Sequence, residues 1–183
     1  MRELYLECYS GISGDMTVAA LLDLGVPGEY LMKELEKLHL DGYEIKISRT
    51  KKNQITATDF DVILKDEHKD EHGHEHAHTH VNDEDVKECH EQEHSHEHTH
   101  VHNSYREIKE FILASELSDR VKEMILKIFQ VIAEAEAQVH GTAVDEVHFH
   151  EVGAVDSIVD ISAAAICLDY LGFDSIVTSE IWE

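Results

Sequence analysis

Cysteine, proline and basic residues are all scarce in this chain of 183 residues. Its three cysteines (Cys8, Cys89 and Cys167) form no CxxC pair, so the sequence predicts neither a disulfide framework nor a thiolate zinc site. Only 15 lysines and arginines stand against 39 aspartates and glutamates, which gives a formal net charge of −24. Nucleic-acid backbones and anionic membrane surfaces both require clustered cations. We therefore expect neither as a partner.

The sequence also lacks a hydrophobic run long enough to cross a membrane. Its longest apolar stretch, residues 158–171, is interrupted by Asp160 and Asp169, and a spanning helix needs about 20 predominantly apolar residues. The first residues lack the basic and apolar regions of a signal peptide. Together with the unpaired cysteines, these features predict a protein of the reducing cytoplasm.

Histidine, in contrast, is unusually concentrated in one segment. Residues 66–102 hold 12 of the 16 histidines, 12 acidic residues and a net charge of −10, against −14 for the rest of the chain. High charge and few aromatic residues predict that this insertion is disordered without metal. The other 146 residues are enough for one hydrophobic core. We expect residues 1–65 and 103–183 to form one folded domain around the insertion.

Hydrophobic periodicity outlines the elements of that domain. Alternating apolar residues predict strands at 3–8, 43–48, 55–64, 144–150 and 173–178. Helical spacing predicts helices at 15–24, 27–38, 105–113, 118–140 and 155–171, the last of them central and buried. A change of phase between Ala57 and Phe60 predicts a bulge or a break in that strand. In the helix at 118–140 the predicted core positions are Val121, Ile125, Ile128, Ile132, Ala135 and Val139. This order predicts an α/β or α+β fold, with a small mixed sheet packed with helices.

The insertion repeats histidine at every second position. Neutral imidazole binds nickel, zinc, copper and cobalt, and the interleaved carboxylates add oxygen ligands. Flexible repetition suits capture and release of metal rather than a closed structural site, and at three or four imidazoles per ion it could hold roughly three or four ions. The alternative is a solvated acidic linker with no ligand role. The expected ligands here are His72, His74, His76, His78, His80, His94, His96, His98, His100 and His102.

A second group of potential ligands follows at residues 148–160. On an extended segment His148 and His150 would project to the same side, about 6.6 Å apart, with Glu151 at the strand end. Asp156 and Asp160 are four residues apart, so their carboxylates share one face of an otherwise apolar helix. A buried carboxylate is costly unless it is paired with a cation or a ligand, so we expect something to compensate these two. The alternative makes Asp156 a helix N-cap and the histidines ordinary hydrogen-bonding residues.

A turn of small residues joins the first predicted strand to the first predicted helix. Backbone amides at such a helix N-terminus could bind a phosphate or carboxylate group, although the turn is neither a Walker loop nor a GxGxxG motif. Asp15 could cap the helix or supply a metal ligand or base. The candidate binding residues are Ser10, Gly11, Ser13 and Gly14.

Long motifs in both parts of the chain resemble a known family. Residues 9–16 (YSGISGDM), and residues 135–141 (AEAQVHG) leading to 147–161 (VHFHEVGAVDSIVDI), are similar to the nickel-insertion protein of nickel-pincer cofactor biosynthesis, a maturation component for lactate racemase. The resemblance covers residues 1–64 and 104–178. It implies a lyase-class cyclometallase that inserts nickel into pyridinium-3,5-bisthiocarboxylic acid mononucleotide. The product carries one carbon–nickel and two sulfur–nickel bonds, and the reaction depends on CTP with Mn²⁺ or Mg²⁺.

The resemblance also implies a second part of the enzyme. The family's nucleotide site belongs to a C-terminal region that this chain lacks, and in some members a frameshift separates the two products. We therefore expect the C-terminal half to be a partner, and self-association is left open. In this interpretation His148 and His150, with Glu151 or Asp15, hold nickel beside the substrate, and Glu151 or Asp156 acts as the base. The alternatives are a nickel or zinc storage protein without catalytic activity, and an adaptor that docks through its apolar helix.

Overall fold

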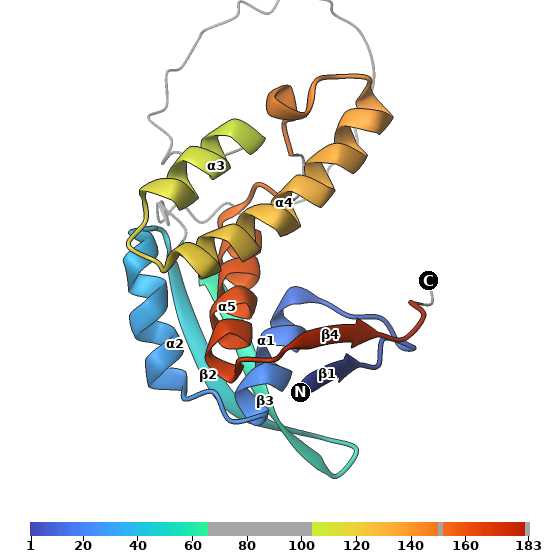
Figure 1. Cartoon of the computed structure of the whole chain (residues 1–183). Coiled ribbons are helices and arrows are strands. Elements are labelled where there is room, and N and C mark those ends of the chain that lie inside the picture. Colours follow the sequence, from blue (N-terminus) through green and yellow to red (C-terminus); the bar gives the residue numbers. More distant parts are fainter. Residues whose placement is uncertain (66–103, 150–151, 182–183) are drawn as a thin grey trace, which may run out of the picture.

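Helices and two small sheets build the fold, as a computed structural model of the chain describes it for residues 1–65, 104–149 and 152–181 (Figure 1). Before the insertion the elements are β1 (Glu3–Leu6), α1 (Gly14–Asp23), α2 (Gly28–Leu35), the 3-10 turn η1 (Glu36–Leu38), β2 (Tyr43–Lys52) and β3 (Ile55–Leu64). After it come α3 (Tyr105–Ala114), α4 (Asp119–His140), the 3-10 turn η2 (Val144–Glu146), α5 (Val155–Leu171) and β4 (Ser175–Thr178). Strands β1 and β4 pair in parallel, whereas β2 and β3 form an antiparallel hairpin. These small mixed pairings among helices confirm the predicted fold class.

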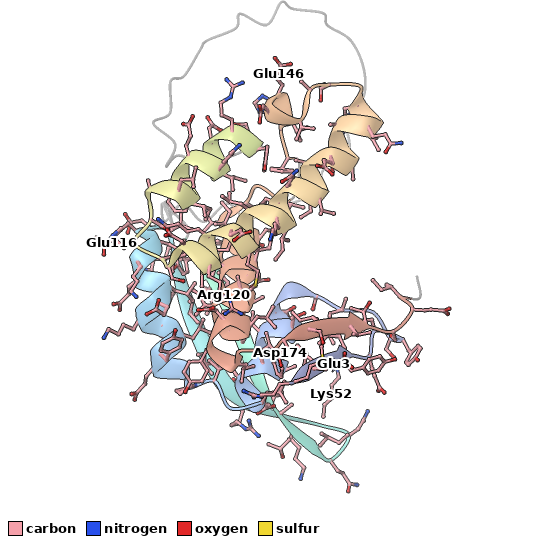
Figure 2. The ribbon with its side chains drawn as sticks, viewed as in Figure 1. Glu3, Lys52, Glu116, Arg120, Glu146 and Asp174 are labelled. Carbon is pink, nitrogen blue, oxygen red and sulfur yellow. The ribbon has the colours of Figure 1, made fainter. Side chains whose placement is uncertain are left out.

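Helix α5 lies at the centre of the core, as its apolar composition predicts. Ile158, Val159 and Ala163 are at most 1% exposed, and the helix packs against α1, α2, α4 and β3. At the start of α4, Arg120 Nε lies 3.1 Å from a carboxylate oxygen of Asp169 and ties α4 to α5 (Figure 2). Because close-packed interiors transmit strain rather than deform, polar side chains that emerge from α5 are held in fixed positions. None of the helices in the described ranges combines the length and apolar character needed to span a bilayer.

The helices of the second half begin and end at capping residues. The hydroxyl of Ser104 accepts a hydrogen bond from the Glu107 amide, and the Glu107 carboxylate accepts one from the Ser104 amide, which forms a capping box at the start of α3. Ser118 caps α4 by accepting from the Val121 amide at 3.3 Å. Gly141 ends α4 in the left-handed conformation, with φ of 67°, which is the usual role of glycine at this position.

The predicted core stripe of α4 is wrong beyond its first turns. Val121 and Ile125 are buried as expected, but from there the stripe continues at Phe129, Ala133 and Ala137. Ile128 and Ile132 are half-buried, Ala135 is exposed and Val139 is 79% exposed. The prediction alternated steps of three and four residues, whereas α4 buries every fourth residue. Steps of four rotate slowly around a helix, so the buried stripe winds gradually around α4 instead of running straight along it.

Two strand predictions are also corrected. Strands β2 and β3 pair without a bulge from Tyr43–Leu64 to Lys52–Ile55, around a two-residue turn in which Asn53 and Gln54 both have positive φ. Ile55 is 72% exposed, so the outer half of the hairpin lies beyond the core and burial does not fix its apolar phase. Residues 144–146 form η2 rather than a strand, and extended structure begins only at Val147.

Candidate functional site

The predicted strand–turn–helix is present at the N-terminus, where residues 7–13 form the loop that leads from β1 to the start of α1. The loop tightens where the Gly11 amide donates to the Cys8 carbonyl at 3.1 Å, and Gly11 adopts a φ of 83°. Cys8 is 1% exposed, which confirms that it is a buried residue. Ser13 is extended and α1 begins at Gly14, so the loop ends at a helix N-terminus as expected.

Gly14 permits an unusually close approach between α1 and α5. A Cβ atom at position 14 would lie 2.5 Å from Oδ2 and 2.8 Å from Cβ of Asp160. The carboxylate of Asp160 accepts a hydrogen bond from the backbone amide of Asp15. The small-residue turn and the acidic face of α5, which sequence analysis treated separately, therefore meet at one site.

Asp160 is an acid with strongly altered chemistry. Its pKa is raised from 3.8 to about 6: burial is the largest cause, the charges of Asp15 and Asp156 act in the same direction, and the Asp15 amide acts in the opposite direction. Its Oδ1 atom is buried and has no hydrogen-bond partner among the described residues. The sequence predicted that the carboxylates of α5 would need compensation. The Asp15 amide provides part of it and leaves one oxygen of Asp160 unsatisfied.

The other two carboxylates have local partners. Asp15 Oδ1 accepts a hydrogen bond from the Ser13 hydroxyl, and the Ser13 side chain makes no capping bond to the helix backbone. Asp156 Oδ1 accepts from the Ser157 amide at 2.8 Å. The N-cap of α5 is Ala154, so Asp156 lies in the first turn of the helix and is not its cap.

A cavity of about 390 Å³ adjoins Asp15, between α1 and the hairpin. Cavities of this size are typical of sites for small organic ligands. Lys52 is the cation among its described lining residues, beside the acidic Asp15, Asp23 and Asp59. The cavity therefore offers one positive group on the hairpin and carboxylates on α1.

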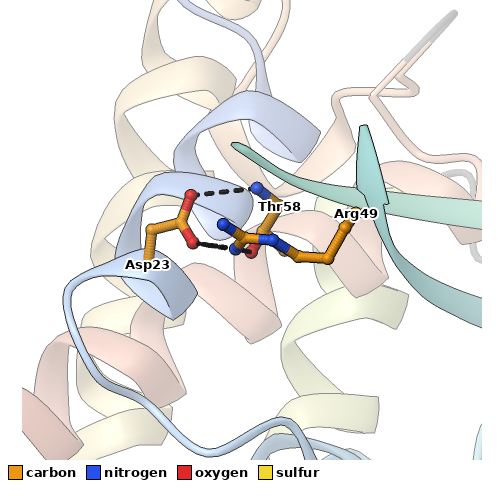
Figure 3. Close-up of polar contacts among 3 residues, drawn as sticks. All are labelled: Asp23, Arg49 and Thr58. Atoms are coloured by element: carbon orange, nitrogen blue, oxygen red, sulfur yellow. Dashed lines mark hydrogen bonds and ion pairs between the residues drawn. The ribbon is translucent and has the colours of Figure 1, made fainter. Parts of the chain in front are cut away.

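Asp23 joins α1 to the hairpin at this cavity. Its carboxylate accepts hydrogen bonds from the amide of Thr58 at 2.9 Å and from its hydroxyl at 2.8 Å, and it pairs with Arg49 (Figure 3). These interactions lower the pKa of Asp23 to about 2, with the Thr58 amide as the largest cause. The negative charge of Asp23 is therefore neutralised by its partners on the hairpin, and these interactions fix the wall of the cavity.

His148 lies in a separate place. Val147 and Phe149 are buried, and the Phe149 ring packs 6.1 Å from Phe129 between ring centroids, so alternation leaves His148 exposed. Its backbone forms an antiparallel bridge with Ser104.

The side chain of His148 lines a cavity of about 310 Å³ with His140, Thr142, Glu146 and Val147, and no residue of α1 or α5 contributes to it. Figure 2 places Glu146 at the opposite end of the molecule from Glu3 of β1. His148 and Asp160 therefore occupy different sites in this structure.

Several predicted site residues lie outside the described residues. These are His150, Glu151 and the ten histidines of the insertion that were expected to bind metal. Within residues 1–65, 104–149 and 152–181, no group of three or more His, Cys, Asp or Glu side chains is arranged to hold a metal ion.

Asp160 was recognised on the acidic face of its helix, from its spacing of four from Asp156, but it was not assigned a role as metal ligand or base. Lys52, Asp23 and His140 were not predicted as site residues. His140 had only its place in a family motif, because the last residue of a helix carries no sign of what it will face.

Comparison with known proteins gives consistent matches over nearly the whole chain. The sequence pattern of the family described as "Nickel insertion protein" matches residues 4–182. A "Pyridinium-3,5-bisthiocarboxylic acid mononucleotide nickel insertion protein" of Clostridium acetobutylicum is 56% identical, over 99% of this chain and 44% of the relative. Proteins of the same name from Alkaliphilus metalliredigens and Geobacillus kaustophilus are 50% and 46% identical, over 100% and 99% of this chain.

The chain spans about two fifths of the length of these relatives, at 44%, 40% and 39%. No solved structure matches it. The coverage by the family pattern and the high identity to several relatives make the assignment plain. This chain belongs to the nickel insertion protein family.

Proposed function

We propose that this chain is the nickel- and substrate-holding part of an enzyme that inserts nickel into pyridinium-3,5-bisthiocarboxylic acid mononucleotide. The observation that carries the proposal is Asp160, a partly buried carboxylate beside Asp15 with an unsatisfied oxygen and a pKa of about 6. It occurs in a chain whose relatives are named for this insertion.

The chemistry of insertion explains why such a carboxylate is useful. Formation of the carbon–nickel bond replaces a ring C–H bond, so the electron pair of that bond goes to nickel and the proton must go to a base. A base works best when its pKa lies near the working pH, and a carboxylate with a pKa of about 6 is ionised at neutral pH yet accepts a proton readily. We assign this role to Asp160, in preference to the earlier candidates Asp156 and Glu151.

Nickel is a substrate of this reaction and must be released to the product. A tight, preformed protein site would oppose that release, and the described residues contain none. We propose that the insertion histidines collect Ni²⁺, that His148 and His150 receive it, and that it then passes to the sulfur atoms of the substrate next to Asp15. Thiolate-type sulfur is a good nickel ligand, so the ion moves toward the substrate.

The phosphate of the substrate needs a positive partner. The amides of Ser10, Gly11, Ser13 and Gly14 were the first candidates, but the carboxylates of Asp15, Asp156 and Asp160 create a negative field close to them. Lys52 supplies a positive charge on the hairpin side of the 390 Å³ cavity, although Asp15, Asp23 and Asp59 also line it and Asp23 is already paired with Arg49. We propose that the mononucleotide lies in this cavity, with its phosphate toward Lys52 and its ring toward Asp15.

The dependence on CTP with Mn²⁺ or Mg²⁺ is assigned to the additional region of the longer relatives. That region is then the protein partner of this chain, and the cytoplasm is the proposed compartment. The overall reaction is of the lyase class, and this chain alone is expected to be inactive.

The test reconstitutes the reaction from separate parts. The chain is mixed with the additional region of the C. acetobutylicum relative, the substrate, Ni²⁺, CTP and Mn²⁺, and the nickel-bearing product is measured by mass spectrometry. Product is expected only with both parts. Asp160→Asn is expected to reduce the rate by at least about 100-fold, whereas Asp41→Asn, a change at an exposed aspartate, should leave it unchanged. Product formation by Asp160→Asn at the normal rate would refute the assigned base.

A further inference from the structure

Strand β1 has one edge that no described residue pairs. The sheet consists of β1 and β4 alone, although parallel sheets normally contain more strands and are covered on both faces. On the paired side, the Arg2 carbonyl accepts from the Asp174 amide at 2.8 Å and the Leu6 carbonyl accepts from the Ser179 amide at 2.9 Å. Alternate residues of a strand direct their backbone groups to opposite edges. The N–H and C=O groups of Glu3, Tyr5 and Glu7 therefore face the unpaired edge.

A mainly apolar groove runs along this edge. Its volume is about 470 Å³, and it is lined by consecutive residues of β1, from Leu4 to Glu7, and by α1 and the loop before it. On the α1 side Ile12, Met16 and Leu24 are 45%, 58% and 55% exposed. A groove bounded by a strand edge and an apolar helix surface has the form of a position for one more strand above a helix.

We propose that this groove receives a β-strand from the additional region of the longer family members. That strand pairs with Glu3, Tyr5 and Glu7 and covers Ile12, Met16 and Leu24. The choice of occupant rests on the proposed two-part enzyme and on length, because this chain spans only about 40–44% of the relatives. An unprotected apolar edge strand promotes aggregation unless a partner covers it.

Location adds a functional reason for this occupant. The loop of residues 7–13 forms one wall of the groove through Gly11 and Ile12 and leads directly to Asp15. A strand docked here brings the additional region to the loop that precedes the proposed site. Docking thereby connects the proposed CTP-dependent part to the residues that hold nickel and substrate.

The experiment compares two leucines that have nearly the same exposure. Leu24 ends α1 in the groove and is 55% exposed, whereas Leu113 lies in the last turn of α3 and is 53% exposed. Binding of the purified additional region of the C. acetobutylicum relative to the whole chain is measured by calorimetry. We expect Leu24→Lys to weaken binding at least tenfold and Leu113→Lys to change it less than twofold. Circular dichroism and the melting temperature check that both variants fold.

A second measurement reads the strand pairing directly. The amide hydrogens of Tyr5 and Glu7 are followed by exchange and NMR in the chain alone and in the complex, and exchange should slow at least tenfold in the complex. Equal binding by Leu24→Lys, unchanged exchange at both amides, or no binding by the unmodified chain would each overturn the proposal. Protection that rises with the concentration of this chain alone would also overturn it, in favour of a second copy as the occupant.

These outcomes are separate from those that test the proposed function. Binding and exchange do not require nickel insertion, so a complex with the expected behaviour that makes no product refutes the function alone. Normal product formation with undiminished binding by Leu24→Lys refutes the docking surface alone.

Discussion

Asp160 lies against the N-terminus of α1, where its surroundings act on its pKa in opposite directions. The Asp15 amide stabilises its ionised form, whereas burial and the neighbouring charges of Asp15 and Asp156 favour its neutral form and raise its pKa to about 6. The unfolded chain has an ordinary aspartate with a pKa of 3.8. Between pH 3.8 and about pH 6, Asp160 therefore carries a proton in the folded protein but not in the unfolded chain. Above this range Asp160 is ionised in both states, and its charge destabilises the fold.

Asp160→Asn should change stability in a way that depends on pH. As pH rises from 3.8 through 6, unmodified Asp160 loses stability that the variant keeps. The free energy of unfolding of the variant relative to the parent should thus rise between pH 4 and pH 7.5, by an amount on the order of 1 kcal/mol after allowance for solvent screening. The difference in melting temperature should rise with it. Thermal unfolding at several pH values measures it. A difference that is constant with pH would contradict the raised pKa, and Asp41→Asn serves as the exposed control.

Gly14→Ala should reveal the close approach of α1 and α5. The new Cβ would meet Asp160 Oδ2 at 2.5 Å, so the carboxylate or the helix must move, at a cost of about 1–3 kcal/mol. In an Asp160→Gly background the atoms in conflict are absent, and the same substitution should cost less than half as much. Denaturant unfolding of the two single variants and the double variant gives the coupling. Simple additivity would show that Gly14 is required for another reason.

At the residue scale, the sequence indicated which side chains could act chemically, but not which of them lie close together in the fold. The carboxylates of Asp15 and Asp156 were candidates because of their local surroundings. Their relation to Asp160 depends on the packing of α1 against α5, which involves residues about 145 positions apart. His148 and Asp160 are close in sequence, but Asp160 does not line the cavity of His148, and the neighbouring Phe149 is buried among α3 and α4.

Elements whose boundaries depend on local interactions were predicted well. Ser118 and Gly141 mark the ends of α4, and the composition of α5 indicates its burial. The interior stripe of α4 was not predictable in the same way, because the residues facing α3 and α5 depend on the crossing of three helices. The register of β3 between Ile55 and Phe60 was equally unmarked, since the turn end of the hairpin extends past the core.

The link between α1 and the hairpin should depend on Asp23. The pKa of this carboxyl is lowered from 3.8 to about 2, so its stabilising contribution is complete above 3.8 and is lost as pH falls toward 2. Asp23→Asn should lower the melting temperature at pH 7, and the difference should shrink as pH falls below 4. Thermal unfolding measures both effects. Asp61→Asn, on the exposed side of β3, should have little effect, and an equal loss in both variants would contradict the prediction.

In the molecule as a whole, the residues at both ends of the insertion are held by the folded part. The Lys65 amide donates to the Gly42 carbonyl at 2.9 Å, and Ser104 caps α3 and bridges to His148. Both attachment points are therefore fixed by residues of the folded part. That residues 66–102 are a separate metal-binding insertion remains a prediction, because composition supports it and the described residues do not include it.

Replacing residues 66–103 by a flexible Gly/Ser linker distinguishes insertion from storage. We expect the melting temperature to change little, nickel binding to fall by roughly three or four ions, and product formation to persist when Ni²⁺ is in excess. Calorimetric nickel titration and the product assay measure these outcomes. Loss of product even with excess nickel and both parts present would favour storage in the insertion as the main function. The double variant His148→Ala/His150→Ala, with the insertion intact, should instead lose product and retain most bound nickel.

The bridge between Ser104 and His148 has a consequence for delivery of metal. His102 is two residues before Ser104, so the covalent chain alone limits their Cα atoms to about 7 Å of separation. The proposed series of metal-binding histidines therefore ends within two residues of the segment that bridges to His148. Under the proposed function, exchange of an ion between His102 and His148 is intramolecular, and its rate is set by an effective concentration of order millimolar or higher rather than by free nickel in solution.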